Sequence, residues 1–257
     1  MSIGIEVSRV GAAQVLRLAR AEKKNALTGA MYAALSDAIG AGDSEPSVAA
    51  HVIIGSGGVF SAGNDLGDFL ATAKGTGNLG ADVVRFIRLL PMVQKPLIAA
   101  VEGKAIGIGT TMLFHCDLVY ATPDASFATP FLDLGLIPEA ASSLLMPQRL
   151  GYARAFAMLA LGEPMSVPDA VAAGFVNRIV APDALEATAL GAAERLAQKP
   201  PEALAMARRL MRGDASAILA RTDVEVAGFR ERLRSPEAAE AFTAFFEKRP
   251  PNFRKSV

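Results

Sequence analysis

The chain has 257 residues, of which 51% are hydrophobic and 20% charged, and its 26 basic residues are balanced by 26 acidic ones. A balanced charge provides no global attraction to nucleic acid or to an anionic membrane surface, and the length suffices for a large core. The single cysteine, Cys116, excludes an internal disulfide, and two histidines leave little material for a metal site.

The chain is expected to be cytoplasmic and to lack a membrane span. Its first residues, MSIGIEVSRVG, have no basic region followed by an apolar one, and its last residues, KSV, do not match a peroxisomal signal. The most apolar stretch, 96–116, is interrupted by Glu102, Lys104 and three glycines. It therefore falls short of the roughly 18 uninterrupted apolar residues of a spanning helix.

Short β-type runs alternate with helical patterns through the first two thirds of the chain, which indicates an α/β core. One helical pattern places Met31, Leu35 and Ile39 on a common face. The predicted strands cover 5–10, 14–18, 51–55, 97–101, 118–121 and 176–180.

From about Ser142 onward, strand signals nearly vanish and helical sequence dominates. Helices are predicted over 152–161, 168–173, 185–197, 202–212 and 238–248. The glycine-rich segment 74–80 is predicted to be a mobile loop, because helix-like sequence follows it directly.

The segment GSGGVFSAG, 55–63, follows a predicted strand and raises the possibility of dinucleotide binding. That fingerprint needs a glycine at its sixth position, where Phe60 stands, so the spacing fails. Two interpretations remain: an ordinary turn after a strand, or a turn whose small residues let backbone N–H groups approach a ligand.

The segment AVEGKAIGIGTTMLFHCD, 100–117, predicts a strand, a glycine-punctuated turn and a buried apolar helix starting near Gly109. Free N–H groups at a helix N-terminus favour an oxyanion or a phosphate. Glycines that only allow tight packing of a core helix would give the same pattern, and the pattern alone does not separate the two interpretations.

Together these two segments resemble the two halves of the oxyanion hole of the crotonase (enoyl-CoA hydratase/isomerase) superfamily. The matching stretches are FSAGND at 60–65 and GKAIGIG at 103–109. Further ordered matches are EKKNALT at 22–28, CDLVYA at 116–121, PDAVAAGFVNRIV at 168–180 and AFFEKRPPNF at 244–253.

The resemblance implies a crotonase-like β/α superhelical spiral core over 1–195 and a C-terminal helical trimerisation region over 196–257. It implies a homotrimer or a hexamer. It also implies that the backbone N–H groups of Ala62 and Ile108 hold the thioester oxygen of an acyl-CoA substrate. Such preorganised donors typically contribute about 10² to 10³ in rate each.

The acidic residues then indicate the reaction. Hydratases of the family use two glutamates, and the matching positions here hold Thr111 and Phe131, which cannot replace them. Glu139 remains, in a stretch that resembles the monofunctional Δ3,Δ2-enoyl-CoA isomerases, and one carboxylate suffices for a 1,3-proton shift. Its apolar neighbours would raise its pKa and a helix N-terminus would lower it, and the sequence leaves open which effect is larger.

Three other acids have weaker claims to a role in the reaction. Asp65 is predicted to be a local cap and Asp117 a structural hydrogen-bonding residue, whereas Asp133 is a weaker candidate for proton handling.

The resemblance also implies a binding path for coenzyme A, which is part of the substrate, so that no separate cofactor and no metal are expected. Lys24 and Ala26 match the contacts to adenine and ribose phosphate. The pantetheine passage and the C-terminal contacts are expected at Ser61, Ala62, Gly63, Asn64, Asp65, Leu66, Phe245 and Lys248. The stripe of the last helix could equally be core packing, and Lys248 could be merely solvated.

The sequence thus predicts an enoyl-CoA isomerase that moves a 3-double bond to the trans-2 position, in β-oxidation of unsaturated acyl chains. Two alternatives stay open: an enoyl-CoA hydratase or other crotonase-type enzyme, and a non-catalytic acyl-CoA-binding subunit. The acyl chain length cannot be read from the sequence.

Overall fold

A computed structural model describes residues 3–65, 67 and 80–253, and its centre is a six-stranded sheet. The first strand pair is antiparallel and all later pairings are parallel. In sheet order, the strands are β1 (Ile5–Val10), β2 (Ala13–Leu18), β3 (Ala50–Ile54), β4 (Leu97–Val101), β6 (Leu118–Ala121) and β9 (Arg178–Ile179).

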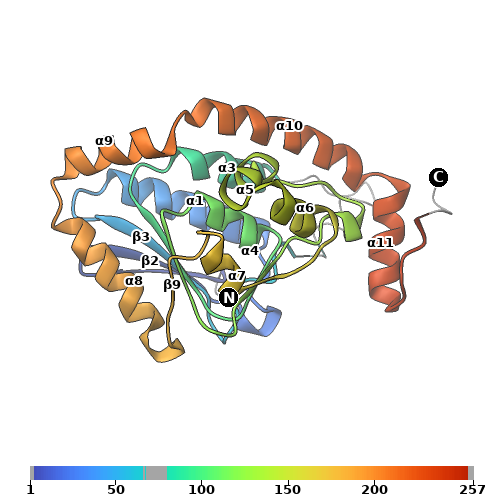
Figure 1. Cartoon of the computed structure of the whole chain (residues 1–257), viewed down its shortest axis with the longest axis horizontal. Helices are drawn as coiled ribbons and strands as arrows, with labels where there is room; N and C mark the ends of the chain where they lie inside the picture. The colour runs from blue at the N-terminus through green and yellow to red at the C-terminus, as the bar shows by residue number, and fades with distance from the viewer. Residues whose placement is uncertain (1–2, 66, 68–79, 254–257) are drawn as a thin grey trace.

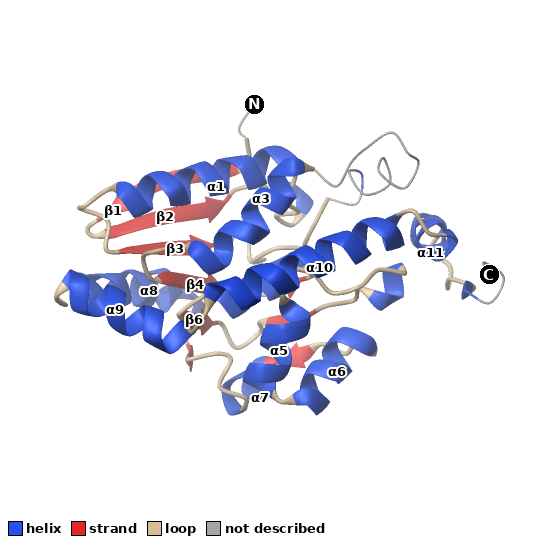
Figure 2. Cartoon of the chain, turned by 90° about the horizontal axis from the view of Figure 1, so that it is seen from above, coloured by secondary structure: helices blue, strands red, loops and turns tan. Residues whose placement is uncertain are grey.

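The central strands β3 and β4 are buried at every position. Parallel strands covered on both faces are built from continuous apolar runs, which is why these segments lack polar alternation. One face packs against α8 (Pro182–Ala197) through residues such as Leu185 and Ala189. The other face packs against α1 (Gly29–Ser44) and α3 (Ala81–Leu89), so the main core lies on that side (Figure 2).

A second, three-stranded sheet lies beside the first and was not predicted. It pairs β5 (Lys104–Ile106) with β7 (Ser126–Ala128), and β7 with β8 (Met165–Ser166). Strands of two or three residues are too short to show a period in the sequence. This small sheet positions the glycine turn that follows β5.

The C-terminal half is helical, as predicted. Figure 1 shows α8, α9 and α10 following one another along the outside of the molecule, with α11 at the opposite end from α8. The helices after the core are α5 (Ser142–Leu150), α6 (Tyr152–Ala160), α7 (Val167–Ala172), α9 (Pro201–Arg212), α10 (Ala215–Leu233) and α11 (Pro236–Glu247).

The longest of these helices, α10, was missed by the sequence analysis. Its sequence ASAILARTDVEVAGFRERL contains valine, threonine and glycine, which have weak helix propensity. Its buried residues, among them Val226 and Phe229, pack against the core and stabilise it instead.

Most of the predicted strands are confirmed within one residue at each end, but the predicted strand 176–180 is reduced to β9. The helix expected near Gly109 begins at Ile108 and is one α-helical turn, α4 (Ile108–Thr111), followed by a 3-10 turn, η3 (Met112–His115). The predicted loop 74–80 lies, except for Gly80, outside the described residues. Within the part of the chain that the structure describes, no helix is long and apolar enough to cross a membrane. The proposed boundary between residues 195 and 196 stays a prediction.

Candidate active site

The turn after β3 is held in place by side chains that hydrogen-bond its backbone. The buried Asn25 amide donates to the carbonyl oxygens of Ser56 (2.9 Å) and Val59 (2.7 Å). The hydroxyl of Ser61 donates to the Asn25 carbonyl (2.9 Å) and accepts from the Gly63 N–H (3.1 Å). Ser61 is fully buried, so the structure assigns it a structural contact rather than the predicted place along a ligand passage.

The turn after β5 lies directly against the first one. The Ser61 N–H donates to the carbonyl oxygen of Lys104 (3.1 Å), and the Ser61 carbonyl oxygen accepts from the Ile106 N–H (2.9 Å). Gly63 has a φ of 89°, and a Cβ atom there would lie 2.8 Å from the carbonyl oxygen of Ile106. Both the backbone conformation and the close approach therefore require glycine at position 63.

In the first turn, the backbone N–H that is free differs from the one that the sequence predicted. The N–H of Ala62 donates to the Lys24 carbonyl at 2.9 Å, so it is not available to a ligand. The N–H of Asp65 is bonded to the Leu27 carbonyl. Between them, the Asn64 N–H has no acceptor among the described residues. Among the described residues, the free N–H of the first turn is therefore that of Asn64, two residues after the predicted Ala62.

The predicted donor in the second turn, Ile108, agrees with the structure. Ile108 is the first residue of α4, and the N–H groups of Thr110 and Thr111 both bond the Gly107 carbonyl. The first N–H groups of a helix have no partner inside the helix. Within the described residues, the Ile108 N–H has no acceptor, so it is available to a ligand.

A third turn carries Glu139 and has an unusual backbone. Ala140 and Ala141 follow it with φ values of 55° and 56°, a left-handed conformation that costs a residue with a Cβ energy. The His115 Nε2 lies 2.8 Å from the Ala140 carbonyl oxygen and must be the donor, since a carbonyl only accepts. Burial lowers the pKa of His115 to about 3, which keeps this imidazole neutral.

Glu139 is the buried carboxyl of the site, with 6% of its surface exposed. Burial raises its pKa to about 8, and the nearby Glu225 carboxyl adds to that rise. The Thr111 hydroxyl donates to the carboxylate at 2.5 Å, which opposes the rise. The pKa of Glu139 is therefore raised, and burial is the largest cause.

Two small cavities connect the turns. One, of about 50 Å³, is lined by Ala62, Gly63 and Gly107 of the first two turns and by Phe131 and Leu136 of the following loop, among others. The second is lined by Asn64, Val83, Ile87, Glu139, Val226 and Phe229. Asn64 and Phe229 line both cavities, so the two cavities are adjacent; Glu139 lines the second, and Gly107, which precedes Ile108, lines the first.

The predicted coenzyme A contacts lie in different parts of the structure. Lys24 is exposed, and the half-buried Ala26 uses its carbonyl to accept from Arg20. Asp65 forms an ion pair with Arg20 at 2.7 Å and accepts from the Gly67 N–H, which confirms its predicted local role. Leu66 lies outside the described residues.

Phe245 and Lys248 lie on and just after α11, with exposed side chains and outside the lining of both cavities. Their role in binding stays a prediction. Asp133 is exposed, and its carboxylate lies against Gly162 rather than beside Glu139, so its suggested help in proton transfer has no geometric support. Asp117 accepts from the Leu97 N–H and from Arg208, a structural role as predicted.

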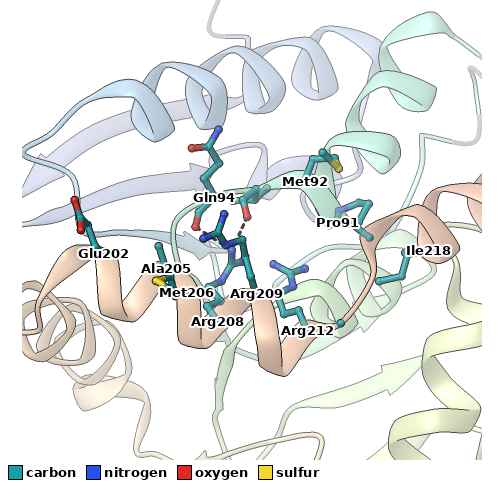
Figure 3. A pocket seen from close by; sticks show the side chains of 13 residues that line it. Pro91, Met92, Gln94, Glu202, Ala205, Met206, Arg208, Arg209, Arg212 and Ile218 are labelled. Atoms are coloured by element: carbon teal, nitrogen blue, oxygen red, sulfur yellow. Dashed lines mark hydrogen bonds between the residues drawn. The ribbon is translucent and has the colours of Figure 1, made fainter.

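A larger cavity of about 520 Å³ lies elsewhere, between α9, the start of α10 and the 3-10 turn η2 (Leu90–Met92). Figure 3 shows Arg208, Arg209 and Arg212 of α9 on one side of it and Met92 and Gln94 on the other. Arg208 is committed to Asp117 and to the carbonyls of Val93 and Gln94. No residue predicted for catalysis or binding lines this cavity, and size alone does not make it the active site.

Sequence reasoning missed two polar groups of the site. Thr111 was interpreted only as the loss of a catalytic glutamate, yet its hydroxyl bonds Glu139. Glu225 gave no signal, because it contacts the site only through α10, far along the chain. In the described part of the chain, no group of three or more His, Cys, Asp or Glu side chains could hold a metal ion.

Comparison with known proteins agrees with this geometry. The profile of a family described as Enoyl-CoA hydratase/isomerase matches residues 10–256. The chain is 33% identical over 254 residues to enoyl-CoA delta isomerase 2 of Rattus norvegicus, and the match covers 97% of the chain and 65% of that relative. It is 32% identical to a probable enoyl-CoA hydratase of Rhizobium meliloti, with 96% of each covered. Among solved structures, an enoyl-CoA hydratase/isomerase from Pseudoalteromonas atlantica superposes with a TM-score of 0.91 at 38% identity, covering 97% of this chain and 99% of that one.

Proposed function

The chain belongs to the enoyl-CoA hydratase/isomerase family and has the crotonase-like α/β fold, and from that premise we propose that it is an enoyl-CoA isomerase. The proposed reaction moves a double bond of an acyl-CoA thioester from position 3 to the trans-2 position.

One observation carries the choice of reaction. Among the described residues that line the two cavities, Glu139 is the only one with a side chain that can exchange a proton. The positions of the two hydratase glutamates hold Thr111, which donates to Glu139, and Phe131, which is buried in the cavity wall. Addition of water needs two such groups, whereas a proton shift within the substrate needs only one.

The proposed mechanism uses one carboxylate and two backbone N–H groups. The Glu139 carboxylate removes a proton from C2, and the electron pair of that C–H bond delocalises into the thioester, whose oxygen becomes negative. The N–H groups of Asn64 and Ile108 donate to this oxygen and stabilise the dienolate. C4 then takes the proton back from Glu139, and the double bond ends between C2 and C3.

The pKa of Glu139 fits both halves of this cycle. A group that first accepts and then returns a proton works best when its pKa is near the working pH. A value of about 8 lies far closer to neutrality than the usual 4.5 of a glutamate. The isomerase activity should therefore rise with pH as Glu139 ionises and level off above its pKa.

A hydratase is the second candidate, because several relatives bear that name. In that case water would add to the 2-enoyl product with the proton-transfer roles shared among Glu139, Asp133 and water. The two candidates differ in which substrate is consumed.

The test is a side-by-side assay of the purified protein on a trans-3-enoyl-CoA and a trans-2-enoyl-CoA. We expect much faster conversion of the 3-enoyl thioester than hydration of the 2-enoyl thioester. Glu139→Gln should lower isomerisation by about 10² to 10⁴, the usual loss for a general base, while acyl-CoA binding survives. Asp133→Asn, an exposed acid of the same loop, is the matched control and should retain activity.

Efficient hydration by the parent enzyme would return the hydratase to first place. Near-parental isomerisation by Glu139→Gln would remove Glu139 as the base. Acyl-CoA binding with neither activity would favour the non-catalytic binding subunit.

Coenzyme A recognition and assembly are further parts of the proposal. Lys24 and Ala26 would meet the adenine and ribose phosphate, with Gly63, Asn64 and Asp65 beside the pantetheine. The exposed Phe245 and Lys248 would contact a coenzyme A of the same or of a neighbouring subunit, and we propose a homotrimer or hexamer. Light scattering of the purified protein tests the assembly.

A further inference from the structure

A second buried carboxyl, Glu225, stands next to the turn that carries Glu139. It comes from the middle of α10 and is 3% exposed. Its carboxylate accepts from the Ala141 N–H at 2.6 Å, from the Ser143 N–H at 3.0 Å and from the Ser143 hydroxyl at 2.5 Å. All three donors belong to the first residues of α5 or to the residue just before it.

These contacts supply what α5 lacks in its own sequence. A helix usually begins with a side chain that accepts from its free N–H groups, but the residue before α5 is Ala141, which has no such side chain. Glu225 acts as this acceptor from another helix. A carboxylate at a helix N-terminus is also favoured by the helix dipole.

The same contacts hold the left-handed residues in place. Each left-handed residue with a Cβ costs on the order of 1–3 kcal/mol and persists only where its surroundings fix it. The turn from Glu139 to Ala141 is fixed from three sides. The Ser142 N–H bonds the Glu139 carbonyl, His115 bonds the Ala140 carbonyl, and Glu225 bonds the Ala141 N–H.

We infer that Glu225 is a positioning residue for the proposed base: it fixes the strained turn that carries Glu139 and places a second negative charge beside its carboxyl. The inference rests on the proposed function, because it assigns Glu225 a role in the reaction of Glu139. It concerns a residue that does not touch the two cavities and therefore acts through another side chain.

The polar and titratable groups around Glu139 and Glu225 come from three elements. From α4, the Thr111 hydroxyl faces Glu139; from η3, His115 faces the turn and is neutral. From α10, Glu225 faces it, with the exposed Arg221 bonded to the Ser143 hydroxyl at 3.1 Å. Burial raises the pKa of Glu225 as well, while the hydrogen bonds from Ser143 and Ala141 and the charge of Arg221 oppose that rise. When it is ionised, the Glu225 carboxylate is the negative charge that raises the Glu139 pKa in addition to burial.

The first experiment is the pH dependence of kcat/KM for isomerisation of a trans-3-enoyl-CoA by Glu225→Gln. Loss of the negative charge lowers the pKa of Glu139. The rising limb of the pH profile, which is the pH range over which kcat/KM increases, should therefore move to lower pH. Loss of the paired contacts should lower the plateau kcat by about tenfold to a hundredfold, the cost of a small misplacement of a catalytic group. KM should change little. A purely structural Glu225 would lower the yield of folded protein or the plateau but would not move the limb.

Three variants sharpen the result. Glu225→Asp keeps the charge but is too short for all three contacts, so its limb should stay near the parental pH while kcat falls. Thr111→Val removes the hydrogen bond that lowers the Glu139 pKa, so its limb should move to higher pH, the opposite direction. Glu231→Gln changes an exposed glutamate of the same helix and should match the parent.

The outcomes separate this inference from the proposed function. If Glu139→Gln abolishes isomerisation and Glu225→Gln has the parental limb and plateau, only the inference about Glu225 is wrong. If Glu139→Gln is active, the proposed function fails first. If Glu225→Gln does not fold, parental kcat in Glu225→Asp overturns the inference.

Discussion

The two glycine turns and the turn at Glu139 use left-handed backbone in different ways. Gly63 and Gly107 adopt positive φ without the steric cost of a Cβ. Among the described residues, the N–H groups of Asn64 and Ile108, which follow them, have no hydrogen-bond acceptor. Ala140 and Ala141 adopt similar angles at a cost, and side chains from distant elements fix them. Tertiary contacts hold both parts of the site, but only the turn at Glu139 relies on them to fix left-handed residues that carry a Cβ.

The difference predicts which substitutions each part tolerates. In the glycine turns the backbone N–H groups are the functional groups, so loss of the N–H of Asn64 should matter far more than loss of its side chain. At Glu139, His115 and Glu225 fix the turn, whereas burial, Thr111 and Glu225 set the pKa. Changes to Thr111 or Glu225 should therefore alter pH dependence as well as rate.

The largest effect expected within the glycine turns is the loss of a backbone donor. Asn64→Pro removes the N–H that we assign to the oxyanion, and kcat/KM should fall by about 10² to 10³. Asn64→Ala keeps the N–H and loses only the side-chain contact with Tyr32, so it should retain most of the activity. Equal activity of the two variants, both folded by circular dichroism, would show that Asn64 is not the donor.

A smaller effect is expected on stability at the Glu139 turn. The folded protein holds the Glu139 proton up to a pH of about 8, whereas an unfolded glutamate releases it near 4.5. A pKa that is raised on folding gives stability below the unfolded pKa, and that stability is lost as the pH rises through the folded pKa.

Glu139→Gln is neutral at every pH and escapes this loss. Its Tm should exceed that of the parent by a few degrees at pH 9, since about 1 kcal/mol shifts the Tm of a chain of this size by roughly 2–4 °C. The difference should shrink toward pH 5. A Tm difference that does not change with pH would contradict the raised pKa. Glu231→Gln, tested in parallel, should show no such trend.

The same contrast explains what the sequence could and could not predict. The buried strands, the two glycine turns and the position of Glu139 follow from local patterns or from the family resemblance. The identity of the first donor does not, because only the bond from Ala62 to the Lys24 carbonyl shows that this N–H is occupied and that Asn64 is free. The resemblance gave the right turn and the wrong residue in it.

Glu225 and Thr111 show the limit more clearly. Both contact the Glu139 turn through helices that pack beside it, and such contacts leave no trace in the spacing of residues along the chain. The weak helix signal of α10 had a further consequence, since without that helix no reason existed to place Glu225 near the site. The small second sheet was missed for a different reason, because its strands are two or three residues long.

The smallest predicted effect tests the glycine turns from the coenzyme A side. The Lys24 carbonyl holds the Ala62 N–H, while its side chain is exposed. Lys24→Ala keeps the carbonyl, so the turn and kcat should be unchanged. An exposed charge pairing with phosphate is worth up to about 1 kcal/mol, so KM should rise by no more than about fivefold. That rise should vanish at high salt, because the contact is screened. Lys23→Ala, its exposed neighbour, is the control. A parental and salt-insensitive KM in Lys24→Ala would remove the side chain from the coenzyme A site, whereas a large fall in kcat would mean that the turn depends on this side chain after all.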